Sequence, residues 1–165
     1  MNEAPMNTVN HRVLAAHLFL RGLPAGHVAV LAAHAQTVRI PARRRLFEAG
    51  GTADRFWLLQ SGQVALDTTV PGDGRVVIET LGRRDVIGLS WLFPPCRWGL
   101  GAVATQPVQA FEIDAVGVRD ACAQDPAFGY EIAARFCRLA LRRLQFTRTR
   151  LSDLARHPEF LAGTG

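Results

Sequence analysis

The chain has 165 residues, of which 48% are hydrophobic and 20% are charged, a composition that excludes a disordered segment and is typical of a globular domain. Its net charge of +5 comes entirely from arginine, because the sequence contains no lysine. The arginines are spread along the chain among carboxylates, so this charge does not predict nucleic-acid binding by this chain alone.

The start of the chain lacks the pattern of a targeting signal. Residues 1–12 are polar, without a basic patch followed by an apolar core, so we expect a flexible tail and not a secretion signal. No apolar run approaches the roughly 20 residues that cross a bilayer. The three scattered cysteines fit a reduced compartment and argue against a disulfide framework. We therefore expect a cytoplasmic protein without membrane contact.

Residues 13–36 predict short N-terminal helices. Gly22 and Pro24 divide this stretch into two pieces, and the second has apolar residues at helical spacing. His27 and His34 are seven residues apart and share a helix face. No carboxylate or cysteine stands beside them at ligand spacing, so we expect no metal site here.

Residues 37–114 change to a strand pattern. Roughly eight short apolar stretches alternate with glycine and proline, and the PGDG tetrad at residues 71–74 is a strong hairpin signal. There is no room for the helices that would separate parallel strands. The pattern predicts a mainly β fold with flanking helices, built as an eight-stranded antiparallel jelly roll.

Residues 115–154 return to a helical pattern. The first helix, residues 115–124, ends at Asp125, because Pro126 begins a helix more readily than it continues one. A long helix then runs to about Leu154, and residues 155–165 are expected to be a flexible tail. The predicted single domain therefore spans residues 13–154.

The long helix carries two apolar stripes. One is assigned to the β-roll of its own chain and consists of Ile132, Phe136, Leu139 and Phe146. The other has the three- and four-residue spacing of a two-helix coiled coil and consists of Tyr130, Ala133, Cys137, Ala140, Leu144, Thr147, Leu151 and Leu154. The second stripe predicts a homodimer seam. The alternative is that both stripes form one wide buried face.

Residues 85–98 have the sequence of an anion-binding turn. Gly88 allows a sharp turn, and it opens an apolar run, residues 89–93, that contains one hydroxyl at Ser90. A short helical turn after Gly88 would aim its free N–H groups at one point. The two prolines that follow would reverse the chain and bring Arg97 beside those groups. The alternative is an apolar plug with a surface arginine.

Three pieces of the sequence resemble a known family. The stretch GTADRFWLLQSGQV, residues 51–64, resembles a strand–turn signature, and Gly88 sits where a phosphate-binding cassette begins. RRLQFT, residues 142–147, is similar to part of the long helix of the catabolite activator. Together with the order of the predicted elements, these pieces make residues 17–154 resemble the cyclic nucleotide-binding domain of the CRP/FNR type.

The resemblance implies a ligand and its contacts. The ligand is a cyclic nucleotide, cAMP or cGMP, or a related small anion, held between the roll and the long helix. Arg97 would grip the phosphate and Thr147 would contact the base. The implied binding residues are Gly88, Leu89, Ser90, Arg97, Trp98, Thr147 and Arg148. Occupancy would change the packing of the long helix, and with it the contacts to a second copy or to an unidentified protein partner.

The cassette departs from the family pattern at two places. Cyclic-nucleotide binders carry a glutamate directly after the glycine to accept the ribose 2′-hydroxyl, and here Leu89 holds that place. The bulky Trp98 follows Arg97, where a small residue is usual. An unpaired buried hydroxyl costs roughly 1–3 kcal/mol, so we expect weak or altered ligand choice. The competing hypothesis is a ligand-free domain, its pocket filled by Trp91 and Trp98, that acts as a protein-interaction or dimerisation module.

No motif predicts catalysis or DNA reading. GxSxG, HExxH and GxxxxGK[ST] do not occur in the sequence, so we expect no enzyme activity. The chain ends nine residues after Arg156, which leaves no length for the helix-turn-helix domain of CRP/FNR transcription factors. We therefore expect a stand-alone sensor or regulatory module without direct DNA binding.

Overall fold

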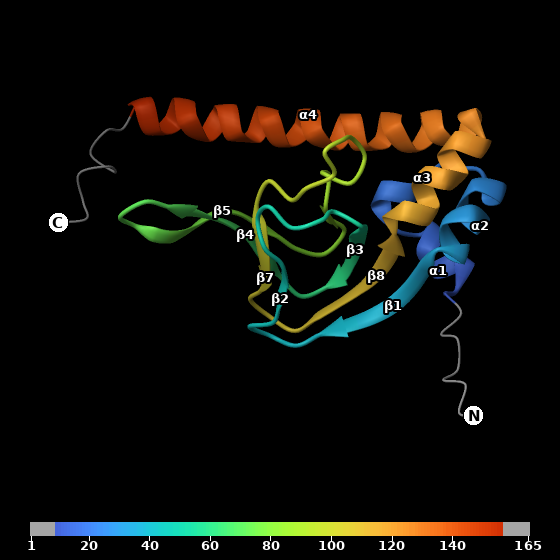
Figure 1. Ribbon diagram of the computed structural model, residues 1–165, viewed down its shortest axis with the longest axis horizontal. Coiled ribbons are helices and arrows are strands. Elements are labelled where there is room, and N and C mark those ends of the chain that lie inside the picture. Colours follow the sequence, from blue (N-terminus) through green and yellow to red (C-terminus); the bar gives the residue numbers. More distant parts are fainter. Residues whose placement is uncertain (1–8, 157–165) are drawn as a thin grey trace.

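The computed structural model describes residues 9–156, without the side chain of Leu154. Helices from both ends of the chain flank a roll of strands, and the long helix α4 lies across one side of the roll (Figure 1). The helices are α1 (His11–Ala15), the 3-10 helix η1 (Leu18–Leu20), α2 (Ala25–Ala33), α3 (Ala115–Gln124) and α4 (Pro126–Arg156).

The strands of the described chain form two four-stranded antiparallel sheets, which confirms the predicted jelly roll. One sheet has the order β1-β8-β3-β6 and the other the order β2-β7-β4-β5. Their bounds are β1 (Ala35–Ile40), β2 (Arg45–Phe47), β3 (Arg55–Ser61), β4 (Val64–Val70), β5 (Gly74–Leu81), β6 (Val86–Ile87), β7 (Gly101–Ala104) and β8 (Val108–Asp114). Strand β8 pairs with both β1 and β3, and it leads directly into α3. The last strand therefore delivers the chain to the helices that cover the roll.

The hairpin between β4 and β5 forms where the sequence predicts it. Gly72 and Gly74 have φ angles of +92° and +75°, which glycine adopts without steric strain. The pairing closes at Val70 and Gly74. The hairpin extends beneath the C-terminal half of α4 (Figure 1), so this half of the helix faces β5 and not the centre of the roll.

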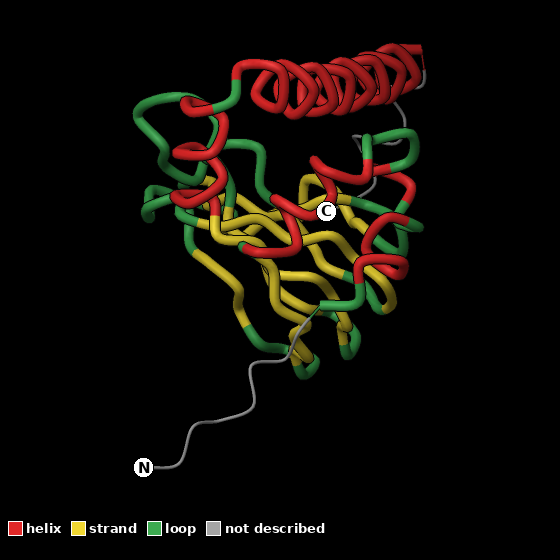
Figure 2. The backbone as a smooth tube through the Cα atoms, turned by 90° about the vertical axis from the view of Figure 1, so that its right-hand side faces the viewer, coloured by secondary structure: helices red, strands yellow, loops and turns green. Residues whose placement is uncertain are grey.

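The N-terminal half of α4 is fixed to the roll by the first predicted stripe. Ile132, Phe136 and Leu139 are buried, and the Phe136 ring contacts Phe56 edge-on with centroids 5.3 Å apart. The assignment of Phe146 to the same buried stripe is wrong, because this side chain is 55% exposed. It lies beside the connection between β5 and β6 and is not packed in the core. Figure 2, which looks roughly along α4, shows the helix above the strands.

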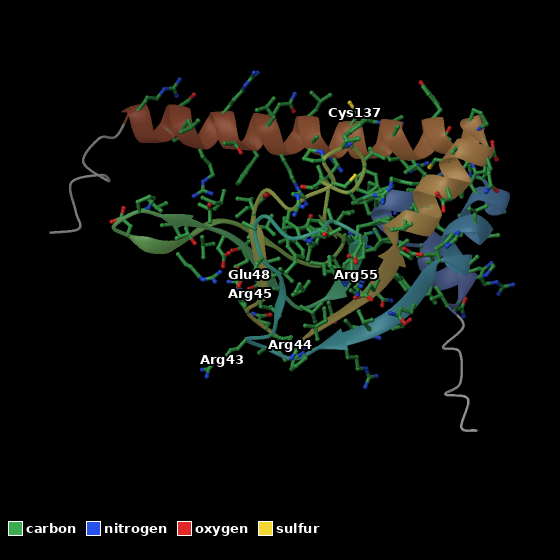
Figure 3. All side chains as sticks on the ribbon, viewed as in Figure 1. Arg43, Arg44, Arg45, Glu48, Arg55 and Cys137 are labelled. Atoms are coloured by element: carbon green, nitrogen blue, oxygen red, sulfur yellow. The ribbon has the colours of Figure 1, made fainter. Side chains whose placement is uncertain are left out.

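The second stripe of α4 is exposed. Tyr130, Leu144 and Leu151 are 74%, 46% and 61% exposed, and Figure 3 shows Cys137 on the side of the helix that points away from the roll. The alternative of one wide buried face is therefore wrong for the single chain. The side chain of Leu154, the last predicted member of this stripe, lies outside the described part of the structure.

The described helices extend into both segments that the sequence predicts to be tails. Helix α1 begins at His11, inside the region expected to be a tail, because the Asn10 side chain accepts a hydrogen bond from the Arg12 N–H and because Val9 is buried. Helix α4 likewise continues to Arg156. Residues 1–8 and 157–165 of the two predicted tails lie outside the described residues.

Candidate ligand-binding site

The cassette segment follows β6 and begins at a buried glycine. Gly88 has φ +92°, and a Cβ atom built on it would lie 3.1 Å from the Trp98 ring and 3.2 Å from the Arg55 carbonyl oxygen. These distances are tighter than most real Cβ contacts, so a side chain here would force its neighbours to shift by a few tenths of an ångström. Glycine is therefore favoured here both for its backbone conformation and for the close approach of its neighbours.

The predicted helical turn after Gly88 is not formed. Residues 89–96 contain two separate turns, closed by hydrogen bonds from the Leu92 N–H to the Leu89 carbonyl at 3.4 Å and from the Cys96 N–H to the Phe93 carbonyl at 3.0 Å. Pro94 and Pro95 lack the N–H groups that would continue a helix. Within the first turn, the fully buried Trp91 stacks on Phe56 with centroids 4.9 Å apart. The core contact of Trp91 thus determines the path of the segment.

A small cavity of about 150 Å³ lies beside Gly88. Its lining includes four of the predicted site residues, which the structure brings together: Gly88, Leu89, Ser90 and Trp98. Ligand pockets for small molecules usually measure roughly 300–1,000 Å³, so this cavity is smaller than most. Trp98 restricts it: the side chain is 5% exposed and stacks on Phe47.

The structure does not bring Arg97 into this cavity. Its guanidinium is exposed and donates a hydrogen bond of 2.9 Å to the Gly50 carbonyl, and its backbone forms a bridge with Thr52. Arg97 therefore ties the cassette to the loop that precedes β3. Arg97 and Trp98 are consecutive residues in extended backbone, so their side chains point to opposite sides of it.

Thr147 and Arg148 also lie apart from the cavity. Both are exposed on α4, and the Thr147 hydroxyl donates to the Arg143 carbonyl within the helix at 2.9 Å. Neither side chain is among the described residues that line the cavity beside Gly88.

Arg143 is the cationic residue that the sequence reasoning did not assign to the site. It lines the cavity, donates from Nη2 to the Val86 carbonyl, and has Nε 3.9 Å from Glu79 Oε2. Burial lowers the pKa of its guanidinium, with the nearby Glu79 carboxylate acting in the opposite direction. Its position could have indicated this role, because Arg143 is four residues after Leu139 and so lies on the helix face that packs against the roll.

A larger cavity of about 670 Å³ lies on the other side of Arg143. It is bounded by η1, by the connection between β5 and β6, and by α4. Arg143 lines both cavities. A ligand bound in either cavity would therefore contact or lie beside the same α4 side chain, Arg143.

A partly buried ion pair connects β2 to β4 in the roll. Arg45 Nη1 donates to Asp67 Oδ1 at 3.0 Å and a second guanidinium nitrogen contacts the other carboxylate oxygen, while Glu48 lies 3.3 Å from Arg45 Nε. The hydrogen bonds from Arg45 lower the pKa of Asp67. Figure 3 shows Arg45 and Glu48 side by side on β2 and its following loop. Arg75 also pairs with Glu48 and lies 3.6 Å from Asp67, so the two carboxylates are balanced by two guanidiniums.

The described residues offer neither a metal centre nor a membrane-spanning helix. No three His, Cys, Asp or Glu side chains among them converge at metal-binding distance. No helix in residues 9–156 combines the length and apolar character needed to cross a bilayer.

Comparison with known proteins shows where this fold belongs. The family model of the cyclic nucleotide-binding domain matches residues 37–125, more than half of the chain. The chain is 27% identical over 142 residues to the CRP-like cAMP-activated global transcriptional regulator of Mycobacterium tuberculosis. This match covers 86% of the chain but spans only 62% of the length of the regulator.

Solved structures show the same fold. A cyclic nucleotide-binding domain from Methylobacillus flagellatus matches with a TM-score of 0.72 and 20% identity over 79% of this chain and 74% of that one. The catabolite activator protein of Thermus thermophilus matches with a TM-score of 0.64 and 22% identity over 83% and 62% of the two chains. The two-sheet roll and the match over residues 37–125 agree, and the chain belongs to the cyclic nucleotide-binding domain family.

Proposed function

We propose that this chain is a regulatory module in which a small phosphate-bearing ligand, a cyclic nucleotide or a related anion, binds in the cavity beside Gly88 and acts on α4. The family supports the ligand class, and the cAMP-activated regulator of Mycobacterium tuberculosis makes cAMP the first candidate. The relatives are regulators, so we propose a binding role and not a catalytic one.

The position of Arg143 carries this proposal. Its guanidinium is largely removed from water, and its nearest carboxylate, Glu79, is 3.9 Å away. A buried cation with weak compensation gains more from an incoming anion than an exposed one does. An anion beside Gly88 would compete with the Val86 carbonyl for this guanidinium and would so alter the packing of α4 on the roll.

The proposed contacts differ from those implied by the resemblance. Gly88, Ser90 and Arg143 would hold the anion, with Leu89 and Trp98 forming the apolar wall. Arg97 would stay on the Gly50 carbonyl and would not contact the anion. Thr147 and Arg148 would contact only a ligand that extends out of the cavity along α4.

The output of the module would be the outward face of α4. Tyr130, Cys137, Leu144 and Leu151 recur at intervals of seven residues and are exposed. This is the spacing of a coiled-coil seam, so we propose that two copies pair through this face. A movement of Arg143 would then change the pairing, or the docking of a protein partner on the same face.

A second candidate function is favoured by one observation. Trp98 fills space beside Gly88 and leaves only about 150 Å³, which supports a domain that binds no ligand and acts through α4 as an interaction module. The two functions differ in whether the folded protein responds to a nucleotide.

Calorimetry of the purified chain with cAMP and cGMP separates the two functions. The proposal expects saturable binding. Arg143→Gln should weaken this binding about tenfold or more, because it removes one charge-assisted hydrogen bond. Arg97→Gln should leave the affinity nearly unchanged. The Arg97 variant is the matched control, because it removes the same charge from the same region. If neither nucleotide binds to a well-folded sample, the ligand-free interaction module is the function that remains.

A further inference from the structure

The larger cavity beside α4 gathers positive charge from two elements. Arg83 and Arg84 come from the connection between β5 and β6, and Arg142, Arg143 and Arg150 come from α4. We call the cavity lined by these five residues the arginine groove. Its volume of about 670 Å³ is within the range of small-molecule sites.

The charge in the arginine groove is not balanced by the fold. Of the described residues that line it, only Glu79 and Asp85 are acidic, against five guanidiniums. Asp85 is engaged by the Gly82 N–H at 2.8 Å, and Glu79 stands 3.9 Å from Arg143. The groove therefore carries a surplus of three positive charges.

Most of these guanidiniums form no hydrogen bond or ion pair within the described chain. The side chains of Arg83, Arg84 and Arg142 are exposed and form no hydrogen bond or ion pair with another residue of 9–156. Burial is the main cause of the lowered pKa of Arg143, and the like charge of Arg142 acts in the same direction. Mutual repulsion opposes this arrangement, and a bound anion would relieve it.

Apart from its charged residues and Thr80, the lining of the groove is apolar, and it includes a partly exposed aromatic ring. Leu18, Phe19 and Leu139 form part of its wall, and Phe146 lines it with 55% of its side chain exposed. The Arg150 guanidinium carbon lies 5.9 Å from the centre of the Phe146 ring. A planar group can stack on such a ring while its charged end meets arginine.

We infer that the arginine groove binds a nucleotide that carries two or more phosphate groups. The phosphates meet Arg83, Arg84 and Arg142, since guanidinium forks match phosphate oxygens, and the base packs on Phe146. The site is separate from the cavity beside Gly88 and shares only Arg143 with it. A nucleotide bound there contacts both α4 and the segment between β5 and β6. It can therefore act on the same helix as a ligand beside Gly88 does.

The test is calorimetry of the full chain at about 0.15 M salt, where distant surface charges are largely screened, with ATP, ADP, AMP and pyrophosphate. Affinity is expected to rise from AMP to ATP. The double variant Arg83→Gln/Arg142→Gln is expected to weaken ATP binding by about tenfold or more, since it removes two charge-assisted contacts. Phe146→Ala is expected to weaken ATP but not pyrophosphate.

The control variant removes the same number of charges elsewhere. Arg39→Gln/Arg44→Gln changes two exposed arginines on β1 and the loop after it, and Figure 3 shows Arg44 on the side of the roll opposite α4. This control should keep ATP affinity. Equal loss in both double variants, equal affinity for AMP and ATP, or no ATP binding would overturn the inference.

Two further readouts keep the sites and ligand classes apart. An excess of cAMP should not displace ATP, because Arg83, Arg84 and Arg142, the proposed phosphate contacts, do not line the cavity beside Gly88. Failure of ATP binding would therefore leave the proposed function standing, and failure of cAMP binding would leave the groove standing. Pyrophosphate binding as tight as ATP, with Phe146→Ala silent, would reduce the site to a bare anion site and overturn the nucleotide assignment. Tighter binding of a DNA duplex, lost in Arg83→Gln/Arg142→Gln, would do the same.

Discussion

The Trp98 indole stacks on the Phe47 ring, with centroids 3.9 Å apart and planes inclined by 16°. Phe47 in turn stacks on Trp57 at 5.5 Å. This row of three rings joins the cassette segment to β2 and β3. It places the Trp98 indole in the space beside Gly88, where a ligand of this family would need room.

Shortening Trp98 is expected to enlarge the cavity and to strengthen cAMP binding. Trp98→Leu removes several buried ring atoms, so we expect a loss of about 2–4 kcal/mol in the free energy of unfolding, measured by urea denaturation. Calorimetry with cAMP should then show tighter binding than the parent chain does. Trp91→Leu is the matched control, because Trp91 is fully buried but does not line the cavity. A similar gain in both variants would show general loosening and would contradict the role given to Trp98.

Alanine substitutions at Gly88 and Gly72 distinguish the effect of backbone strain from the effect of steric contact. Both have φ +92°, but a Cβ on Gly88 would meet Trp98 and Arg55 closely, whereas one on Gly72 would meet nothing within 4 Å. We expect Gly72→Ala to lower the free energy of unfolding by about 1–2 kcal/mol through strain alone. Gly88→Ala should lower it by about 1–3 kcal/mol more because of overpacking. Urea denaturation of the two variants measures the difference, and equal losses would refute the contact at Gly88.

The Arg45–Asp67 pair should make stability depend on acid pH. The folded-state pKa of Asp67 is lowered by its hydrogen bonds from Arg45, so the unfolded chain binds this proton more tightly than the folded chain does. The resulting stabilisation is fully present above the unfolded pKa, about 4, and is lost as pH falls through the lower folded pKa.

Asp67→Asn tests this dependence. The variant should lose up to about 3 kcal/mol at neutral pH, because Arg45 keeps its charge without its main partner. Urea midpoints measured from neutral pH down to about pH 3 should fall less steeply for the variant than for the parent. Asp120→Asn, at an exposed residue of α3 without a side-chain partner among the described residues, should follow the parent curve. Identical slopes for Asp67→Asn and the parent would contradict the assignment.

The seven-residue spacing on α4 predicts a specific cross-link. In a parallel pair of helices about a two-fold axis, Cys137 of one copy faces Cys137 of the other. Mild oxidation or a short bis-maleimide should therefore give a covalent dimer on non-reducing gels, and Cys137→Ser should abolish it. Persistence of the product in that variant would assign it to Cys96 or Cys122 and contradict the pairing.

The same face can be disrupted by charge. Leu144→Arg/Leu151→Arg should convert the dimer to a monomer in light scattering, because two buried apolar seam residues would become like charges across the interface. Val77→Arg is the control, since Val77 on β5 is 57% exposed, close to the 61% of Leu151. A parent chain that is already monomeric at high concentration would refute the seam.

Local signals predicted the parts of this fold that local interactions decide. The PGDG hairpin and the helix start at Pro126 are correct because turn and cap preferences act over a few residues. The helical turn after Gly88 is wrong because Trp91 packs against Phe56, which is far away in the sequence. Phe146 has helical spacing with Leu139, but periodicity does not report where a helix leaves the core.

The sequence by itself determined the order of strands and helices, the glycine turn at Gly88 and the likeness of residues 17–154 to one family. Only the tertiary structure decided which arginine faces the cavity. Arg97 is adjacent to Trp98 in the chain but binds the Gly50 carbonyl, whereas Arg143 arrives from a helix more than 40 residues later. Periodicity and spacing constrain neighbours along the chain, while the direction of a long side chain depends on the packing of elements that the sequence keeps far apart.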